Sequence, residues 1–237
     1  MIDIELKDHN WWERYFAVGG DWERHGGRQQ TRVFAEHFVR RANLPASGTF
    51  SLLDAGCALG DALASFGASF PQASLHGLDF SSTAISRARQ SLGDKVHLAQ
   101  GDLESVRGLF DAIYCSNTLE HFADVHHKTR HLIRHCRRLF VMVPFRELRD
   151  GQPLRPNPTQ HHQHTFERDS FDFLLREGLA SHIDTSVFAC PGAWGWSAPQ
   201  HALQWLKNLV RTALGRRWVR APYQILYTIE AASAPNG

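Results

Sequence analysis

The sequence lacks paired cysteines, a long hydrophobic run and an excess of charge of either sign. Its four cysteines are scattered without a C-x-x-C pair, which argues against both a disulfide framework and a zinc knuckle. No apolar run approaches the roughly 20 residues that a membrane-spanning helix requires. The formal net charge is only +2 and basic residues gather only late in the chain, so nucleic-acid binding is not predicted.

Composition and the opening residues predict a cytoplasmic protein with one domain. Of the 237 residues, 43% are apolar and 21% are charged, which is ordinary for a folded globular chain. The first stretch, MIDIELKDHN, is polar and acidic, unlike a secretory signal peptide. We find no internal repeat, and we expect either a monomer or a homodimer.

Strand-like and helix-like segments alternate after residue 49. Apolar runs predict strands at 50–55, 74–80, 95–102, 110–117 and 139–145. Amphipathic stretches predict helices at 60–70, 82–92 and 124–138, the last with Cys136 on its inner face. A further helix is expected at 166–178, capped by Thr165 and ended by Gly178, followed by a strand pair at 181–189 and 223–231. This alternation predicts an α/β fold with a doubly wound, mostly parallel, seven-stranded sheet.

The pattern also divides the chain into four regions. Residues 1–45 are expected to form an N-terminal helical lid with a glycine-rich break at 18–27, and residues 46–190 the core. Residues 191–221 are expected to be a late helical insertion, and 222–237 the final strand and tail. The insertion is basic and amphipathic, and we expect it to pack on its own domain or to dimerise rather than to contact a membrane.

The loop DAGCALG, from Asp54 to Gly60, follows the first predicted strand. Its glycines allow a tight turn and a close approach of a ligand to the backbone. The spacing does not fit the G-x-G-x-x-G of nicotinamide-binding loops, because Ala58 and Asp61 stand where glycines are required. No Gly-Lys-Ser/Thr follows, and Asp54 would repel a pyrophosphate. The pattern therefore indicates a ligand with a cationic or hydroxyl-rich part.

Two further acids stand where the next predicted strands end. Asp79 closes LHGLD and suits a carboxylate that accepts hydrogen bonds from both ribose hydroxyls. Asp102 closes HLAQGD and suits an acceptor for an adenine amino group, with Leu103 beside the ring. The carboxyl ends of parallel strands meet at one edge of a sheet, where ligands bind in such folds. One acid alone would often be a helix cap, but three in this order favour a binding site.

These motifs together resemble those of the class I S-adenosylmethionine-dependent methyltransferases that act on small molecules. The resemblance covers about Phe50 to Gly178 and includes LLDAGCALG, LHGLDFS, AQGDLES and FDAIYCSNTLEHFAD. It implies a Rossmann-like methyltransferase fold and S-adenosylmethionine as the cofactor, with S-adenosylhomocysteine as the product. The implied cofactor-binding residues are Arg28, Asp54, Gly56, Cys57, Ala58, Gly60, Asp79, Phe80, Gly101, Asp102, Leu103 and Asn117. Ala58 departs from the glycine that is common at its position in the family.

The resemblance implies methyl transfer to a small polar acceptor, with oxygen favoured over nitrogen. A hydroxyl of a sugar or secondary metabolite is the expected acceptor, and an N-methyltransferase or a non-catalytic cofactor-binding subunit are the alternatives. Candidate catalytic bases are His121 and His164, the latter in a cluster with His161 and His162. For each of these histidines, a solvated loop position is the competing interpretation.

A metal site is not predicted. Asn117-x-x-Glu120-His121 resembles the magnesium pattern of some O-methyltransferases, but asparagine replaces the first glutamate, so Mg²⁺ is not favoured. In the family, an N-terminal helix closes over the cofactor. This implies an aromatic wall from Trp11, Trp12 and Tyr15, for which ordinary packing on the core is the alternative.

Overall fold

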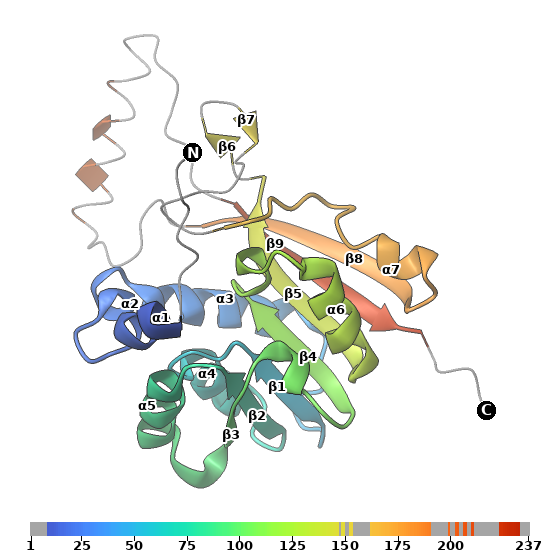
Figure 1. The fold of residues 1–237 in the computed structure, drawn as a ribbon, viewed down its shortest axis with the longest axis horizontal. Helices are drawn as coiled ribbons and strands as arrows, with labels where there is room; N and C mark the ends of the chain where they lie inside the picture. Colours follow the sequence, from blue (N-terminus) through green and yellow to red (C-terminus); the bar gives the residue numbers. More distant parts are fainter. Residues whose placement is uncertain are drawn as a thin grey trace.

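A seven-stranded sheet forms the centre of the structure (Figure 1). The computed structural model describes residues 9–146, 148–149, 152–153, 162–190 and 223–232, together with six positions between 199 and 210. The strands are β1 (Ser51–Ala55), β2 (Ser74–Asp79), β3 (His97–Gln100), β4 (Phe110–Ser116), β5 (Cys136–Phe145), β8 (Ala180–Ala189) and β9 (Tyr223–Ala231). Their order is β3-β2-β1-β4-β5-β9-β8. The first five are parallel and β9 is antiparallel to β5 and β8, which confirms the predicted sheet.

Helices cover both faces of this sheet. One face carries α3 (Gly27–Arg41), α4 (Asp61–Ser69) and α5 (Ser82–Leu92), and the other carries α6 (Val125–Arg134) and α7 (Phe173–Arg176). The remaining elements are α1 (His9–Tyr15), α2 (Asp21–Arg24), the 3₁₀ turns η1 (Gly93–Lys95), η2 (Leu103–Ser105) and η3 (Leu119–His121), and the hairpin β6 (Leu148–Arg149) and β7 (Gln152–Pro153). The short helix α2 lies inside the stretch that was predicted to be a break.

An aromatic cluster joins α3 and α4 to the sheet. The ring of Phe38 on α3 lies 4.6 Å from that of Tyr114 and 4.9 Å from that of Phe140, measured between centroids. Phe66 of α4 lies 5.0 Å from Phe38. All four side chains are buried, and each buried ring contributes roughly 1.5–3 kcal/mol of hydrophobic stabilisation. The helix α3 is therefore part of the core, whereas α1 and α2 lie beyond it.

Two predicted helices are shorter in the structure, because strand pairing captures their ends. The helix predicted at 124–138 ends at Arg134, and Cys136 is wrongly placed on it: Cys136 opens β5 beside Phe110. The helix predicted at 166–178 is helical only in α7. Phe166 forms a bridge with Phe145, the Tyr227 hydroxyl donates to the carbonyl of Glu167, and the chain then runs through turns at residues 168–172 before α7 begins.

The helix predicted at 166–178 also has a different N-terminal cap, because it is shorter in the structure. Thr165 lies well before α7 and does not cap it, contrary to the prediction, and Asp172 stands at the N-cap position. Gly178, at φ +67°, ends the segment as predicted. The insertion predicted at 191–221 lies outside the described residues except at six helical positions, where Leu203, Leu206 and Val210 are exposed. Among the described residues, no helix combines the length and apolar character needed to cross a membrane.

The helix α1 is fastened to the start of α5 by one carboxylate. Glu13 accepts hydrogen bonds from the backbone N–H groups of Ser82 (2.8 Å) and Thr83 (2.9 Å) and from the hydroxyl of Ser81 (3.1 Å). Partial burial opposes ionisation, but these hydrogen bonds prevail and lower the pKa of Glu13 to about 2. A negative charge at a helix N-terminus is favoured by the exposed N–H groups and by the helix dipole. Glu13 thus holds α1 against α5.

Three residues of the loop between β1 and α4 adopt the left-handed backbone conformation. Gly56 has φ +90°, Ala58 φ +46° and Gly60 φ +77°. The N–H groups of Gly56 and Cys57 both donate to the carbonyl of Leu78 at the end of β2. A Cβ atom on Gly56 would come within 2.3 Å of Thr118 Oγ1, so the glycine is required there by both conformation and space. Ala58 adopts the left-handed conformation despite its side chain.

We expect Gly56→Ala to lower the free energy of unfolding by at least about 2 kcal/mol, because left-handed strain and the clash with Thr118 add. Ala58→Gly is the matched comparison. Relief of strain at that position offsets the lost methyl burial and the added chain entropy, so we expect a change below about 1 kcal/mol. Urea denaturation of the three proteins measures both values. Equal stability of Gly56→Ala and the wild type would contradict the assigned loop conformation.

We expect Glu13→Gln to speed amide hydrogen exchange in α1 by at least about fivefold, because losing the charge weakens the attachment by about 1 kcal/mol or more. Arg14→Gln is the control, since Arg14 is exposed on the same helix. Exchange followed by mass spectrometry of peptides from residues 9–24 gives the readout. Equal exchange in both variants would show that α1 is held by other contacts.

Candidate functional site

Three acidic side chains lie at the carboxyl ends of neighbouring parallel strands. Asp79 is the last residue of β2, and Asp54 is the penultimate residue of β1, where it pairs with Gly77. Asp102 follows the end of β3 by two residues. Because β3, β2 and β1 are adjacent in the sheet, the three acids share one edge, as the sequence predicted.

Asp79 connects the loop after β1 to the start of α5. Its Oδ2 accepts a hydrogen bond from the N–H of Ala58 (2.8 Å), and its Oδ1 accepts one from the N–H of Ser81 (2.9 Å). The residue is buried, and each carboxylate oxygen keeps a lone pair for a ligand hydroxyl. The carboxylate is therefore held in one orientation before any ligand arrives.

The buried acids at this edge resist ionisation. Burial, followed by the nearby carboxylate of Asp79, raises the pKa of Asp54 to about 8. Burial also raises the pKa of Asp79 to about 6, against the lowering effect of the hydrogen bonds from Ser81 and Ala58. The thiol of Cys57, between them in the loop, has its pKa raised well above its usual range by burial and by both acids. The site thus favours an arriving positive charge or hydroxyl group.

The side of the site next to β3 combines an exposed acid with apolar surface. Asp102 is exposed at the start of η2, and Leu103 beside it is buried. The N–H of Gly101 donates to the carbonyl of Asp79 (3.0 Å), which ties the ends of β2 and β3 together. The ring of Phe80 meets the edge of Trp12 at 6.2 Å between centroids. A flat aromatic ligand would find apolar contacts and one acceptor here.

Asn117 marks the end of β4. Its φ of +47° is a left-handed conformation that asparagine tolerates, and its N–H donates to the carbonyl of Met142 (2.8 Å). Its Oδ1 is buried and has no hydrogen-bond partner in the part of the chain that the structure describes. Because an unsatisfied buried acceptor is costly, this oxygen is suited to an incoming donor or cation.

Glu120, His121 and His162 form a compact cluster beyond Asn117. One ligand-type atom of each lies within 4.8 Å of the others, and the two imidazole centroids are 5.1 Å apart. Glu120 is fully buried, and both histidines are partly exposed. His162 comes from the segment before α7, so this contact joins positions 41 residues apart in the sequence.

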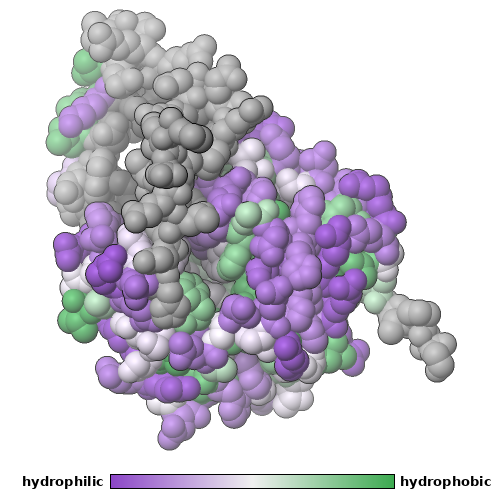
Figure 2. Space-filling view, in the orientation of Figure 1, coloured by the Kyte–Doolittle hydropathy of each residue, from purple (hydrophilic) through white to green (hydrophobic). Residues whose placement is uncertain are grey.

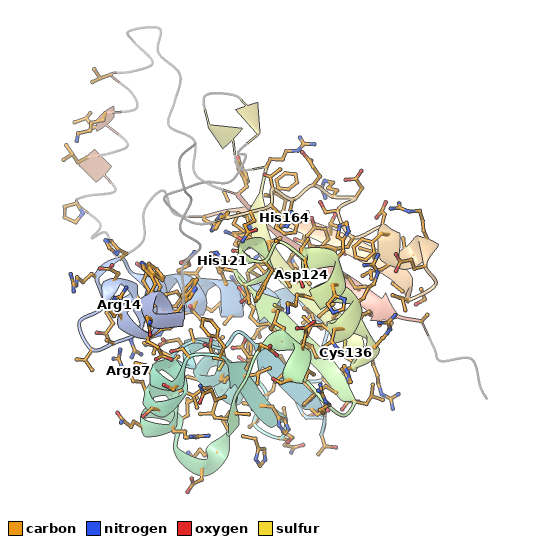
Figure 3. The ribbon with its side chains drawn as sticks, viewed as in Figure 1. Arg14, Arg87, His121, Asp124, Cys136 and His164 are labelled. Carbon is orange, nitrogen blue, oxygen red and sulfur yellow. The ribbon has the colours of Figure 1, made fainter. Side chains whose placement is uncertain are left out.

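The structure places the second candidate base, His164, differently from His162. His164 is partly exposed and its Nε2 lies 3.3 Å from the carbonyl of Ala123. In the sequence, His162 is one member of a histidine cluster. The sequence pattern does not show whether His162 or His164 lies beside His121. His161 lies outside the described residues. Figure 3 shows His121 and His164 in the region between α1 and α6.

The aromatic residues of α1 lie against both ends of this site. The ring of Trp12 is 5.2 Å from that of His121 and 6.2 Å from that of Phe80, so it spans from the β4 end to the β2 end. Trp11 stacks on Tyr15 at 4.5 Å. In the face drawn in Figure 2, hydrophobic side chains are visible in a depression between the α1 region and α6, within a hydrophilic surround.

Arg28 lies at the first turn of α3, beside the loop after β1. Its Nη1 is 3.1 Å from Oδ1 of the buried Asp61, and its Nη2 is 3.7 Å from Glu23. Arg32 joins the same carboxylate at 3.1 Å. These ion pairs orient the guanidinium and leave some of its five donors for a ligand. Sequence reasoning gave Arg28 a ligand role but missed Asp61 as its partner.

Known proteins that resemble this chain are methyltransferases. A family model described as a methyltransferase domain matches residues 53–140. Over 107 residues the chain is 30% identical to the trans-aconitate 2-methyltransferase of Deinococcus radiodurans, a match that covers 44% of this chain and 42% of that protein. The matched region therefore spans less than half the length of this relative.

Solved structures share the fold over nearly the whole chain. The magnesium protoporphyrin IX methyltransferase of Synechocystis PCC 6803, with bound S-adenosylmethionine, aligns with a TM-score of 0.56 at 21% identity, covering 92% of this chain and 89% of that one. The plantazolicin methyltransferase in complex with S-adenosylhomocysteine aligns with a TM-score of 0.55 at 16% identity, covering 95% and 96%. The matched segment, residues 53–140, is therefore a methyltransferase domain, and the chain has the Rossmann-like fold of the methyltransferases solved with S-adenosylmethionine or S-adenosylhomocysteine.

Proposed function

We propose that this protein transfers a methyl group from S-adenosylmethionine to a hydroxyl oxygen of a small polar acceptor. The observation that carries the proposal is the pair of buried carboxylates, Asp54 and Asp79, at the ends of β1 and β2 beside a left-handed loop. A cationic, hydroxyl-rich ligand is what such an edge would stabilise. Relatives named as methyltransferases of small molecules support the same activity.

In this proposal, residues at the carboxyl ends of the strands bind different parts of the cofactor. Asp79 accepts the ribose hydroxyls, and Asp102 accepts the adenine amino group, with Leu103, Gly101 and Phe80 around the ring. The loop formed by Asp54, Gly56, Cys57, Ala58 and Gly60 holds the methionine part. Arg28 pairs with its carboxylate through donors that Asp61 leaves available. Asn117 places its unsatisfied Oδ1 near the sulfonium and the methyl group.

The reaction is a direct displacement at the methyl carbon. The acceptor oxygen forms the new O–C bond while the S–C bond breaks, and the bonding pair moves to sulfur and neutralises its positive charge. The hydroxyl proton leaves to a base or to solvent. The main task of the protein is to align the three atoms and exclude water, which α1 serves by covering the site. At the acceptor end, the cluster that contains His121 is the group that can polarise the hydroxyl.

Calorimetric titration with S-adenosylmethionine and S-adenosylhomocysteine tests the first half of this proposal. We expect Asp79→Ala to weaken binding of both by at least about tenfold, because a charge-assisted hydrogen bond contributes roughly 1.5–3 kcal/mol. Asp79→Asn is the second variant, since it keeps the shape of the side chain. Asp94→Ala, which removes an exposed acid after α5, is the control.

Transfer of a labelled methyl group to a panel of sugars, phenols and amines tests the second half. A labelled methyl ether is the expected product. Binding without transfer to any acceptor would favour a non-catalytic cofactor-binding subunit, and a labelled amine would favour N-methylation. Unchanged cofactor binding in both Asp79 variants would remove the assignment of the ribose site.

Cofactor binding at pH 7 should release up to about one proton per chain. Asp54 has a pKa of about 8 without ligand, so it is mostly protonated at pH 7. A nearby cation favours the carboxylate, lowers this pKa and expels the proton, so affinity should rise as the pH rises toward 8. Titrations in phosphate and in Tris buffer measure the released protons through the difference in apparent enthalpy.

Asp54→Asn should abolish this buffer dependence, because an amide has no proton to release. Asp124→Asn, which changes an exposed acid before α6, should retain it. Equal apparent enthalpies for the wild type in the two buffers would place the cationic part of the cofactor away from Asp54.

A further inference from the structure

The geometry points to a site for a divalent transition-metal ion of the zinc class, formed by Glu120, His121 and His162 beyond the end of β4. The three ligand-type atoms lie within 4.8 Å of one another, so small side-chain rotations would bring all of them to about 2.1 Å from one ion. They come from two segments, the turn η3 and the strand-like stretch before α7, and converge only in the folded chain. This proposal departs from the sequence-based expectation that no metal is bound.

The cluster is held in place by its surroundings. The N–H of Gln163 donates to the carbonyl of Glu120 (2.7 Å), and the side-chain amide of Gln163 donates to the carbonyl of His121 (2.8 Å). His162 is therefore fixed relative to the other two residues through its neighbour. The rings of Trp12 and His121 lie 5.2 Å apart between centroids, at an interplanar angle of 74°. Pre-oriented ligands lose less entropy on binding an ion, which favours a built site over a chance contact.

Burial and charge favour an ion over a purely structural role. Glu120 is fully buried, and a carboxylate in a low-dielectric interior is stabilised by a nearby positive charge. The Oδ1 of Asn117, three residues earlier at the end of β4, is buried without a hydrogen-bond partner among the described residues. A dication close to these oxygens would stabilise both groups.

The donor set selects the class of metal. Two imidazoles and one carboxylate are the ligands of catalytic zinc sites that leave a position open, and they also suit other late transition metals. Mg²⁺ prefers oxygen ligands throughout, so it fits this set poorly. This distinction separates the site from the magnesium pattern that the sequence resembles, in which Asn117 occupies a glutamate position.

The inference rests on the proposed function for the role of the ion. An open coordination position would accept the acceptor hydroxyl, lower its pKa and release its proton to solvent before the oxygen attacks the methyl carbon. His121 then acts as a ligand and not as the proton acceptor. The ion does not take part in the breaking of the S–C bond, and no redox change is involved.

Titration of the metal-stripped full chain with Zn²⁺ tests the site, and the visible absorption of Co²⁺ reports its ligands. We expect one tight equivalent per chain. His162→Ala and Glu120→Gln should each weaken it by more than about 100-fold, since lost ligands cost more than lost outer-shell partners. His135→Ala is the matched control, because His131 and His135 form a partly exposed pair whose rings lie 4.6 Å apart and could bind zinc non-specifically. Circular dichroism confirms that each variant is folded.

Three outcomes would overturn the site: unchanged zinc affinity in both folded variants, loss of the tight equivalent in His135→Ala, or displacement of zinc by Mg²⁺ at similar concentrations. Failure of the two proposals is distinguishable, because metal binding is measured without cofactor or acceptor. Tight zinc binding without any methyl transfer would leave the site standing and remove the proposed function. Methyl transfer that persists in chelator, together with unchanged zinc affinity in His162→Ala, would remove the metal site and leave the proposed function standing.

Discussion

The carboxylate of Asp79 is the acceptor on which the cofactor edge depends, because it holds two separate segments at once. It receives the N–H of Ala58 from the loop after β1 and the N–H of Ser81 from the start of α5. Asp54 is buried close to it, and two neighbouring carboxylates in a low-dielectric site resist being ionised together. Two hydrogen bonds thus orient Asp79, while burial makes the site favour an arriving positive charge.

The start of α5 also joins this edge to the covering helix α1. Ser81 donates its N–H to Asp79, while its hydroxyl and the next two N–H groups donate to Glu13. Trp12, the neighbour of Glu13, lies against Phe80 at one end of the site and His121 at the other. A shift of α5 would therefore move both Asp79 at the end of β2 and the covering helix α1. The cluster at the acceptor end is instead anchored by Gln163, from a distant part of the chain.

Local signals in the sequence were sufficient for most of the core. The helix 82–92 and the strand 223–231 have the predicted limits, because a serine cap and an unbroken apolar run are encoded within each segment. The predicted helix 124–138 was too long, since the register between β4 and β5 draws Cys136 into the sheet. Amphipathic periodicity continues through His135 and Cys136, so nothing local marks that boundary. Competition between helix and strand was decided by a neighbour distant in sequence.

By itself, the sequence determined the order of strands and helices along the chain, the tight glycine-containing loop and the acids at three strand ends, because each depends on periodicity and on residues a few positions apart. Only the tertiary structure decided which histidine lies beside His121, that Asp61 orients Arg28, and that Glu13 fastens α1. Arg28 and Asp61 are 33 residues apart in the sequence, and Glu13 and Ser82 are 69 residues apart. Side chains so far apart meet only where the packed core brings their backbones together, and no local pattern encodes that distance.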